Sequence, residues 1–221
     1  MGQPAWSYSS LTAYETCPRR YELTKVLKKV TEPQTDATIW GNQVHKALEL
    51  RVKDKTPLPK GMSMYEPLCA KLDVAPGQVF TEKKMALNAQ FQPVAWMAKD
   101  CWVRSILDVQ IDAGKNAAVL DWKTGKAKPE SSQLMLSAAF MFHSRPYVQK
   151  VTTSFVWLKE NTTTKEVFTR DQLPEIWQEF LPRVQRLEIA YRDNKWEAKP
   201  SGLCREWCPV GKALCEHCGK Q

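Results

Sequence analysis

Three short β-type runs, followed by an apolar helix and a fourth strand, constrain the fold more than any other feature of this sequence. The three runs span residues 79–87, 102–111 and 117–122, and turn residues separate them. Short connections between strands favour antiparallel neighbours, so these runs predict a meander. Residues 131–143 (SSQLMLSAAFMFH) are predicted to form an apolar helix, and residues 150–158 to form a further strand. This order predicts an α/β fold with a mixed central sheet flanked by helices.

Helical patterns surround this strand-rich part of the chain. Trp40, Val44, Leu48 and Val52 recur every four residues, which predicts one apolar stripe on a helix. The other expected elements are helices over 9–29, 39–53, 65–72 and 173–192 and a strand over 164–169. Pro18 is expected to interrupt the first of these helices after a short stretch. No pattern repeats along the chain. We therefore expect a single domain over residues 1–221, with a cysteine-rich tail over residues 200–221.

Composition and charge narrow the class of protein. The chain has 221 residues, of which 43% are hydrophobic and 25% charged, as in ordinary globular proteins. Neither a long apolar run nor a signal peptide is visible, so we expect a cytoplasmic protein with no membrane partner. The 32 Lys and Arg outnumber the 24 Asp and Glu, and the net charge of +8 favours nucleic acid as a partner. Trp6 and Tyr8 are candidates to stack on bases.

Two carboxylates and a lysine form the first candidate site. Side chains alternate along a strand, so Asp121 and Lys123 project to the same side. A hairpin through Gly114 brings Asp108, at the end of the preceding run, alongside Asp121. Two adjacent carboxylates repel one another unless a cation lies between them, and Mg²⁺ or Mn²⁺ suits such oxygen ligands. The alternative is a surface ion pair between Asp121 and Lys123 at a strand end.

These residues carry a family resemblance. Asp108, followed by the run Asp121-Trp122-Lys123-Thr124-Gly125, resembles the signature of the PD-(D/E)xK nuclease superfamily in its RecB-like branch. Three further matches follow in the expected order: Gly41 with His45, the acid Glu82, and Gln133-Leu134-Met135-Leu136. Ser137 stands where the branch has a tyrosine. The resemblance implies a restriction-endonuclease-like core.

The same resemblance implies the roles of these residues. His45, Asp108, Asp121 and the Trp122 carbonyl are expected to ligate the metal, and Lys123 to assist the attacking water. Glu82 and Gln133 are expected to place the substrate or the metal. The implied activity is a DNA exonuclease on single-stranded ends, in recombination, replication or repair, prokaryotic or phage-encoded. A structure-specific endonuclease on branched DNA and a non-catalytic DNA-binding module are the alternatives.

Cysteines predict a second metal site. Seven cysteines without an export signal argue against disulfides, because the cytosol keeps thiols reduced. Residues 11–21 (LTAYETCPRRY) resemble the opening of the CRISPR-associated and phage RecB-like exonucleases. That resemblance implies a [4Fe-4S] cluster held by Cys17, Cys204, Cys208 and Cys215. The alternatives are no metal, or a Zn²⁺ site in the tail that adds Cys218, with His217 as a further possible ligand.

Basic residues follow Cys17 on the first predicted helix. By the same resemblance, we expect Arg19, Arg20 and Tyr21 to contact DNA. Contacts from arginine to phosphate would be independent of base sequence and sensitive to salt. The alternative is that these arginines form a solvated helix face.

Overall fold

The computed structural model describes residues 4–127 and 132–219. The chain divides into two compact units. Residues Asp36–Trp177 form the first, here called the sheet unit; Met1–Thr35 together with Gln178–Gln221 form the second, here called the terminal unit. Each unit is described by itself, and the single domain expected over residues 1–221 stays a prediction.

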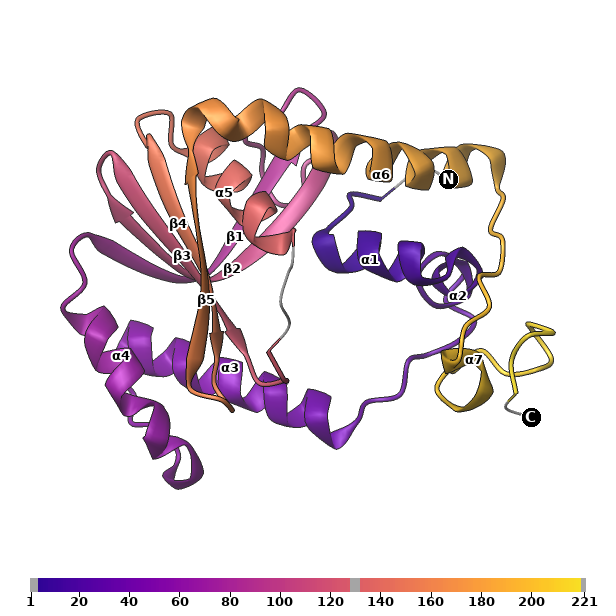
Figure 1. Cartoon of the computed structure of the whole chain (residues 1–221), viewed down its shortest axis with the longest axis horizontal. Coiled ribbons are helices and arrows are strands. Elements are labelled where there is room, and N and C mark those ends of the chain that lie inside the picture. Colours follow the sequence, from indigo (N-terminus) through magenta and orange to yellow (C-terminus); the bar gives the residue numbers. More distant parts are fainter. Residues whose placement is uncertain (1–3, 128–131, 220–221) are drawn as a thin grey trace. The chain divides into compact units, whose positions relative to one another are not determined.

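A five-stranded mixed sheet is the centre of the sheet unit (Figure 1). Its spatial order equals its sequence order: β1 (Gln78–Asn88), β2 (Cys101–Ala113), β3 (Asn116–Lys123), β4 (Lys150–Trp157) and β5 (Thr162–Thr169). β2 runs antiparallel to both of its neighbours, β1 and β3; β3 and β4 run parallel, and β5 returns antiparallel to β4. The predicted meander and the predicted mixed sheet are both confirmed.

Helix α5 (Gln133–Ser144) makes the crossover from β3 to β4, because two parallel neighbours cannot be joined by a tight turn. It covers one face of the sheet, where Leu134 packs with Phe155 and Trp157 of β4. Most of its side chains are buried, which explains why its sequence is apolar on all sides. Residue 131, the expected start of this helix, lies outside the described residues.

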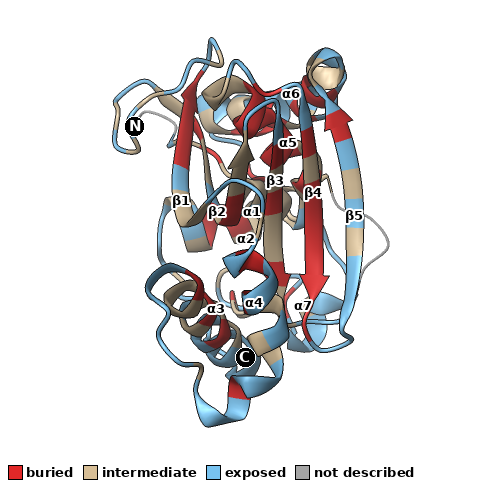
Figure 2. Ribbon diagram, turned by 90° about the vertical axis from the view of Figure 1, so that its left-hand side faces the viewer, coloured by how far each residue is buried: buried red, intermediate tan, exposed pale blue. Residues whose placement is uncertain are grey.

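The opposite face of the sheet carries α3 (Asp36–Asp54) and α4 (Glu66–Asp73), which follows the short 3-10 helix η2 (Lys60–Tyr65). Val44, Leu48 and Val52 of α3 pack against Val109, Trp122 and Val156 of the sheet. The expected stripe on α3 therefore forms, but its first member does not join the core, since Trp40 is 41% exposed. Burial is concentrated on the central strands, while β5 is exposed along much of its length (Figure 2).

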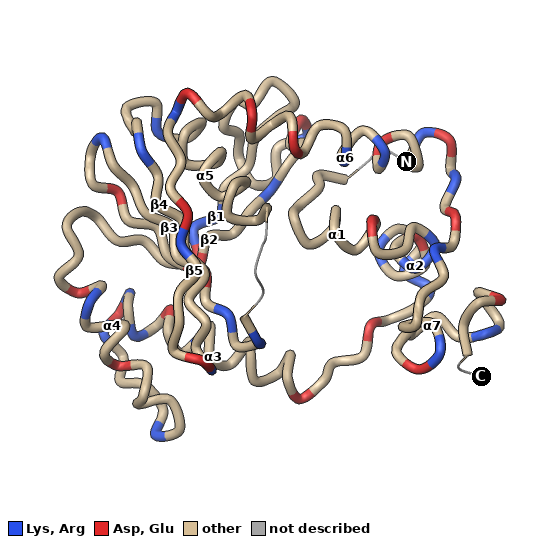
Figure 3. Tube along the Cα trace, viewed as in Figure 1, with Lys and Arg blue, Asp and Glu red and all other residues tan. Residues whose placement is uncertain are grey.

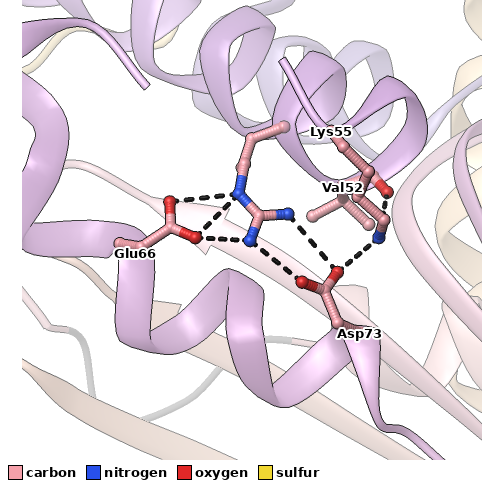
Figure 4. A network of polar contacts seen from close by, with 5 residues as sticks. Val52, Lys55, Glu66 and Asp73 are labelled. Atoms are coloured by element: carbon pink, nitrogen blue, oxygen red, sulfur yellow. Dashed lines mark hydrogen bonds and ion pairs between the residues drawn. The ribbon is translucent and has the colours of Figure 1, made fainter. Parts of the chain in front are cut away.

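An ion-pair network ties α3 to α4 (Figure 4). The Arg51 guanidinium donates to Glu66 at 2.8 Å from Nε and to Asp73 at 2.9 Å from Nη2. Lys55 also binds the Asp73 carboxylate. Hydrogen bonds from these two cations lower the pKa of Asp73 to about 2. Both acids therefore neutralise Arg51, and its role is structural.

The terminal unit contains four whole helices: α1 (Tyr8–Thr16), α2 (Pro18–Tyr21), the π-helix η1 (Glu22–Val26) and the short α7 (Leu203–Glu206). Helix α6 (Leu173–Asp193) begins in the sheet unit, after η3 (Arg170–Gln172), and belongs to the terminal unit from residue 178 onward. The expected helix over 9–29 is interrupted at Cys17, which is extended at φ −162° and ψ 108°. Pro18 explains the break, because a proline disfavours the helical conformation of the residue before it. Trp6 is 1% exposed and stacks on Phe180, so its expected role in base stacking is wrong.

The lengths and polarities of the helices can be compared with what a membrane span requires. Within residues 4–127 and 132–219, every helix is too short or too polar to span a bilayer.

Candidate functional site

The candidate site lies where β2 and β3 stop pairing. Their register runs from Ala113 opposite Asn116 to Val109 opposite Leu120, while β3 continues alongside β4 to Lys123. Asp108 and Asp121 are the first residues past this point. Asp108 occupies the gap, because its Oδ2 accepts the Trp122 backbone N–H at 2.8 Å. The hairpin through Gly114 thus brings the two carboxylates to one place, as the strand pattern predicts.

Three potential metal ligands converge beside this gap. His45 of α3, Glu82 of β1 and Asp108 of β2 each offer one ligand atom, and these atoms all lie within 4.8 Å of one another. His45 Nδ1 is 3.2 Å from Asp108 Oδ2. No second group of this kind occurs among the residues that the structure describes. Two carboxylates and one imidazole suit a divalent cation such as Mn²⁺ or Mg²⁺.

The backbone of Glu82 is unusual for a strand. Its φ is +48°, in the left-handed region, although Thr81 and Lys83 on either side pair regularly with Val109 and Leu107. Few non-glycine residues adopt this region, and such strain is concentrated at functional sites. The residue with this unusual backbone is thus the one whose carboxylate lies near the potential ligand atoms of His45 and Asp108.

Asp121 belongs to a second polar group on the α5 side of the sheet. Lys123 Nζ lies 2.7 Å from Asp121 Oδ1 and donates to Gln133 Oε1 at 3.1 Å. Gln133 Nε2 in turn donates to Asp121 Oδ2 at 2.5 Å. Asp121 and Lys123 do share one side of β3, and Phe155 lies beneath the ammonium at 4.7 Å. Asp121 is outside the group of three ligands formed by the other elements.

The two groups perturb one another electrostatically. Burial and the charge of Asp108 raise the pKa of Asp121 to about 6, against the opposing effect of Lys123 and His45. Burial and Asp108 also raise the pKa of Glu82. Burial alone would lower the pKa of His45, but its hydrogen bond with Asp108 and the nearby carboxylates outweigh this effect and raise it. A cation bound among these carboxylates would relieve their repulsion.

A pocket of about 520 Å³ opens onto the three ligands. Gly41, Ile106 and Thr124 also line it. A Cβ at Gly41 would lie 3.2 Å from Thr124 Oγ1, so glycine lets α3 approach the end of β3 closely. The sequence pattern places Gly41 one turn before His45 but carries no signal for this packing contact.

Comparison with known proteins decides the family. The sequence profile of the PD-(D/E)XK nuclease superfamily matches residues 5–216. The chain belongs to the PD-(D/E)XK nuclease superfamily. No curated protein sequence matches the chain significantly. The predicted membership of this superfamily is confirmed.

Solved structures share the fold of this superfamily member. A protein from Eubacterium rectale that bears a provisional exonuclease name has a TM-score of 0.56 at 13% identity, over 92% of this chain and 86% of its own. The structure named SSO0001 has a TM-score of 0.53 at 14% identity, over 97% of this chain and 87% of its own. At these identities the likeness shows the fold alone.

The candidate iron-sulfur ligands of this nuclease-superfamily chain all lie in the terminal unit. Cys208 and Cys218 are buried together with Leu23, and Cys215 packs against them. Cys17 is not a member of this buried cluster, and its sulfur accepts the Lys199 backbone N–H at 3.4 Å. No three described cysteine sulfurs lie within 4.8 Å of one another, as a tetrahedral zinc site requires. Cys69, outside this group, is fully buried in the core of the sheet unit.

The expected DNA contacts near Cys17 have partners within the terminal unit. Arg19 Nη1 lies 2.5 Å from Glu22 Oε2, and Arg20 Nη2 lies 3.3 Å from Glu32 Oε1. Tyr21 is 4% exposed, and its ring packs against those of three aromatic neighbours, Tyr14, Tyr191 and Trp196. Tyr21 is thus a core residue of this unit, while the two arginines are only partly buried.

Proposed function

We propose that this chain is a metal-dependent DNA exonuclease of the RecB-like branch that hydrolyses phosphodiester bonds at single-stranded ends. One observation carries the proposal: His45, Glu82 and Asp108 converge within ligand distance beside the Asp121–Lys123 pair. That combination, in a member of a nuclease superfamily, supports hydrolysis over passive DNA binding. The provisional exonuclease name of the Eubacterium rectale neighbour agrees with this choice.

In this proposal His45, Glu82 and Asp108 hold the divalent cation, with Asp121 and the Trp122 carbonyl as further ligands. When bound, such a cation lowers the pKa of water and neutralises charge on the phosphate. Lys123 would place an ammonium beside the same phosphate and orient the attacking water with the one N–H donor that Asp121 and Gln133 leave. Gln133 is a positioning residue, because its side chain bonds both Asp121 and Lys123.

The test is cleavage of end-labelled DNA by the purified chain in Mn²⁺. We expect the wild type to shorten single-stranded DNA from an end, and Asp121→Ala to lose this activity. Lys165→Ala is the matched control, since Lys165 is exposed on β5 at the far edge of the sheet. Cleavage of circular single strands, flaps or junctions would instead favour the endonuclease. Binding without cleavage of any substrate would favour the DNA-binding module.

We further propose a [4Fe-4S] cluster on Cys17, Cys204, Cys208 and Cys215. The placement of these cysteines in one unit and the packing of the tail around Leu23 support it. Iron and sulfide analysis of anaerobically purified protein tests it, with about four of each per chain expected. Stoichiometric zinc would favour the tail site with Cys218, and a metal-free, folded chain would overturn both. Arg19 and Arg20 stay proposed phosphate contacts, in a cytoplasmic enzyme of prokaryotic or phage DNA metabolism.

A further inference from the structure

The β1–β2 hairpin continues away from the metal ligands on the same face of its strands. Asp108, Ile106 and Arg104 alternate along β2, so their side chains share one face. Ile106 lines the pocket that holds Asp108 and is 44% exposed. Lys84 of β1 pairs in register with Ile106, so the Lys84 side chain lies beside that of Ile106 on the same face. The hairpin therefore offers a surface that is continuous with the candidate site.

An aromatic ring on this surface has two cations close to it. Trp96 belongs to the connection between β1 and β2, and its ring is only partly buried. The Arg104 guanidinium lies 5.3 Å from its centroid and Lys84 Nζ 5.7 Å. Both cations thus lie at cation–π distance of one ring. Arg104 also donates from Nε to the Cys101 sulfur at 3.2 Å, which orients its side chain.

The charges of Lys84 and Arg104 are not neutralised. Neither forms an ion pair with a carboxylate of residues 4–127 or 132–219. Other cations of the sheet unit differ: Arg51 is held by Glu66 and Asp73. Basic and acidic residues are interspersed along the chain (Figure 3), so two uncompensated cations beside one partly buried ring are a local feature.

We propose that Lys84, Arg104 and Trp96, here called the hairpin track, bind single-stranded DNA next to the scissile phosphate. Lys84 and Arg104 contact phosphates, and Trp96 stacks on a base. Basic grooves with aromatic platforms bind single strands because every unpaired base offers a π face, whereas duplex bases are already stacked. From Asp108 to Arg104 the strand advances about 13 Å. That length corresponds to about four stacked nucleotides at about 3.4 Å each.

This inference deepens the proposed function and rests on DNA being the substrate. It adds a binding surface for that substrate, which holds a single strand over several nucleotides beyond the cleaved bond. The hairpin track lies wholly within the sheet unit and uses none of the residues proposed to ligate the metal or to assist the water. Variants of the track are therefore expected to raise KM more than they lower kcat.

Binding tests the track without relying on cleavage. A fluorescent oligothymidylate of about 20 nucleotides, longer than the track, is titrated in Ca²⁺. The double variant Lys84→Ala/Arg104→Ala is expected to weaken binding and to reduce the slope of log K against log salt by about 1.4, at about 0.7 per phosphate contact. Lys165→Ala, the control on β5, should leave the slope unchanged. An unchanged slope in the double variant would overturn the phosphate contacts.

The base contact needs its own comparison. Trp96→Ala is expected to weaken binding of the thymidylate by roughly 5- to 150-fold, the range measured for loss of one stacked base. Trp96→Phe, which retains a ring, should restore most of this loss and controls for misfolding of the connection. An abasic strand of equal length should bind the wild type and Trp96→Ala equally. A uniform loss on both strands would reject stacking.

Cleavage separates this inference from the proposed function. With Mn²⁺, the double variant should raise KM for long single strands by about tenfold more than it raises KM for the shortest cleavable substrate. Loss at every length would place these residues in the reaction instead and overturn the track. A wild type that binds but cleaves nothing would reject the proposed function while the binding comparison still decides the track. Equal affinity of the wild type for duplex and single-stranded DNA would also reject the track.

Discussion

The Asp108 carboxylate accepts the backbone N–H of Trp122 at 2.8 Å across the gap where β2 and β3 part. Asp108→Asn preserves an acceptor for this bond but removes the charge. We expect cleavage to fall by at least about 100-fold, because a neutral amide is a poor ligand for a divalent cation. Hydrolysis of labelled single-stranded DNA in Mn²⁺ measures this loss.

Thermal unfolding checks the same variant without cleavage. At a Mn²⁺ concentration about 100 times its Kd, the wild type should gain about 2.7 kcal/mol, or roughly 5 to 10 °C in Tm. Asp108→Asn should gain much less. Equal Mn²⁺-induced shifts in both proteins would show that Asp108 is not a ligand.

Gln133 bridges Asp121 and Lys123, and its removal should lower kcat more than it raises KM. We expect Gln133→Ala to reduce kcat about 10- to 100-fold, as loss of a group that orients metal ligands does. Gln133→Asn should be equally impaired, because its side chain is shorter by one methylene and cannot span both partners. Full activity of Gln133→Asn in steady-state hydrolysis would contradict the bridging role.

Periodicity explains why part of this site can be predicted from the sequence. The alternation of side chains along a strand suffices to place Asp121 and Lys123 together, and the short hairpin suffices to bring Asp108 near Asp121. The periodicity does not reveal that Asp121 bonds Lys123 and Gln133, whereas Asp108 lies with His45 and Glu82. That division depends on where β2 and β3 diverge, which no local pattern records.

Gly41 should carry a steric constraint that a double-mutant cycle detects. Alanine in place of an interior helical glycine normally stabilises by about 1 kcal/mol. At Gly41 the new Cβ would lie 3.2 Å from Thr124 Oγ1, so we expect Gly41→Ala to gain nothing. In the Thr124→Ala background the same change should recover about 1 kcal/mol in urea unfolding. An equal gain in both backgrounds would show that the contact is relaxed.

His143 should make stability depend on pH. Burial, followed by the charge of Arg170, lowers its pKa to about 4, and its Nε2 accepts the Trp177 indole N–H at 2.9 Å. The unfolded chain therefore binds this proton at higher pH than the folded chain. Stability is expected to fall as the pH drops from about 6.5 to about 4, by about 1 to 2 kcal/mol after allowance for solvent screening, and His143 adds no further loss below that.

The variant His143→Gln isolates this contribution, because its amide oxygen can accept the same hydrogen bond and does not titrate. Urea unfolding of both proteins at about pH 7 and about pH 4.5 gives the comparison. The wild type should lose more stability than the variant over this range. Identical losses would assign the pH dependence to other groups.

Long-range packing accounts for what sequence patterns miss elsewhere. Trp6 resembles an exposed aromatic near a terminus, yet Phe180, far along the chain, stacks on it and buries it. Trp40 shows the reverse, since it continues the stripe of Val44 but lies outside the core. The break at Cys17, by contrast, follows from the adjacent Pro18 and is local.

The left-handed backbone of Glu82 has a consequence for how this sequence would change over time. A φ of +48° suits glycine or asparagine better than glutamate, so folding alone favours their substitution at this position. If the carboxylate is needed, selection for activity opposes that drift. In descendants that have lost the activity, position 82 is expected to be among the first of the site to turn into glycine or asparagine, with a gain in stability.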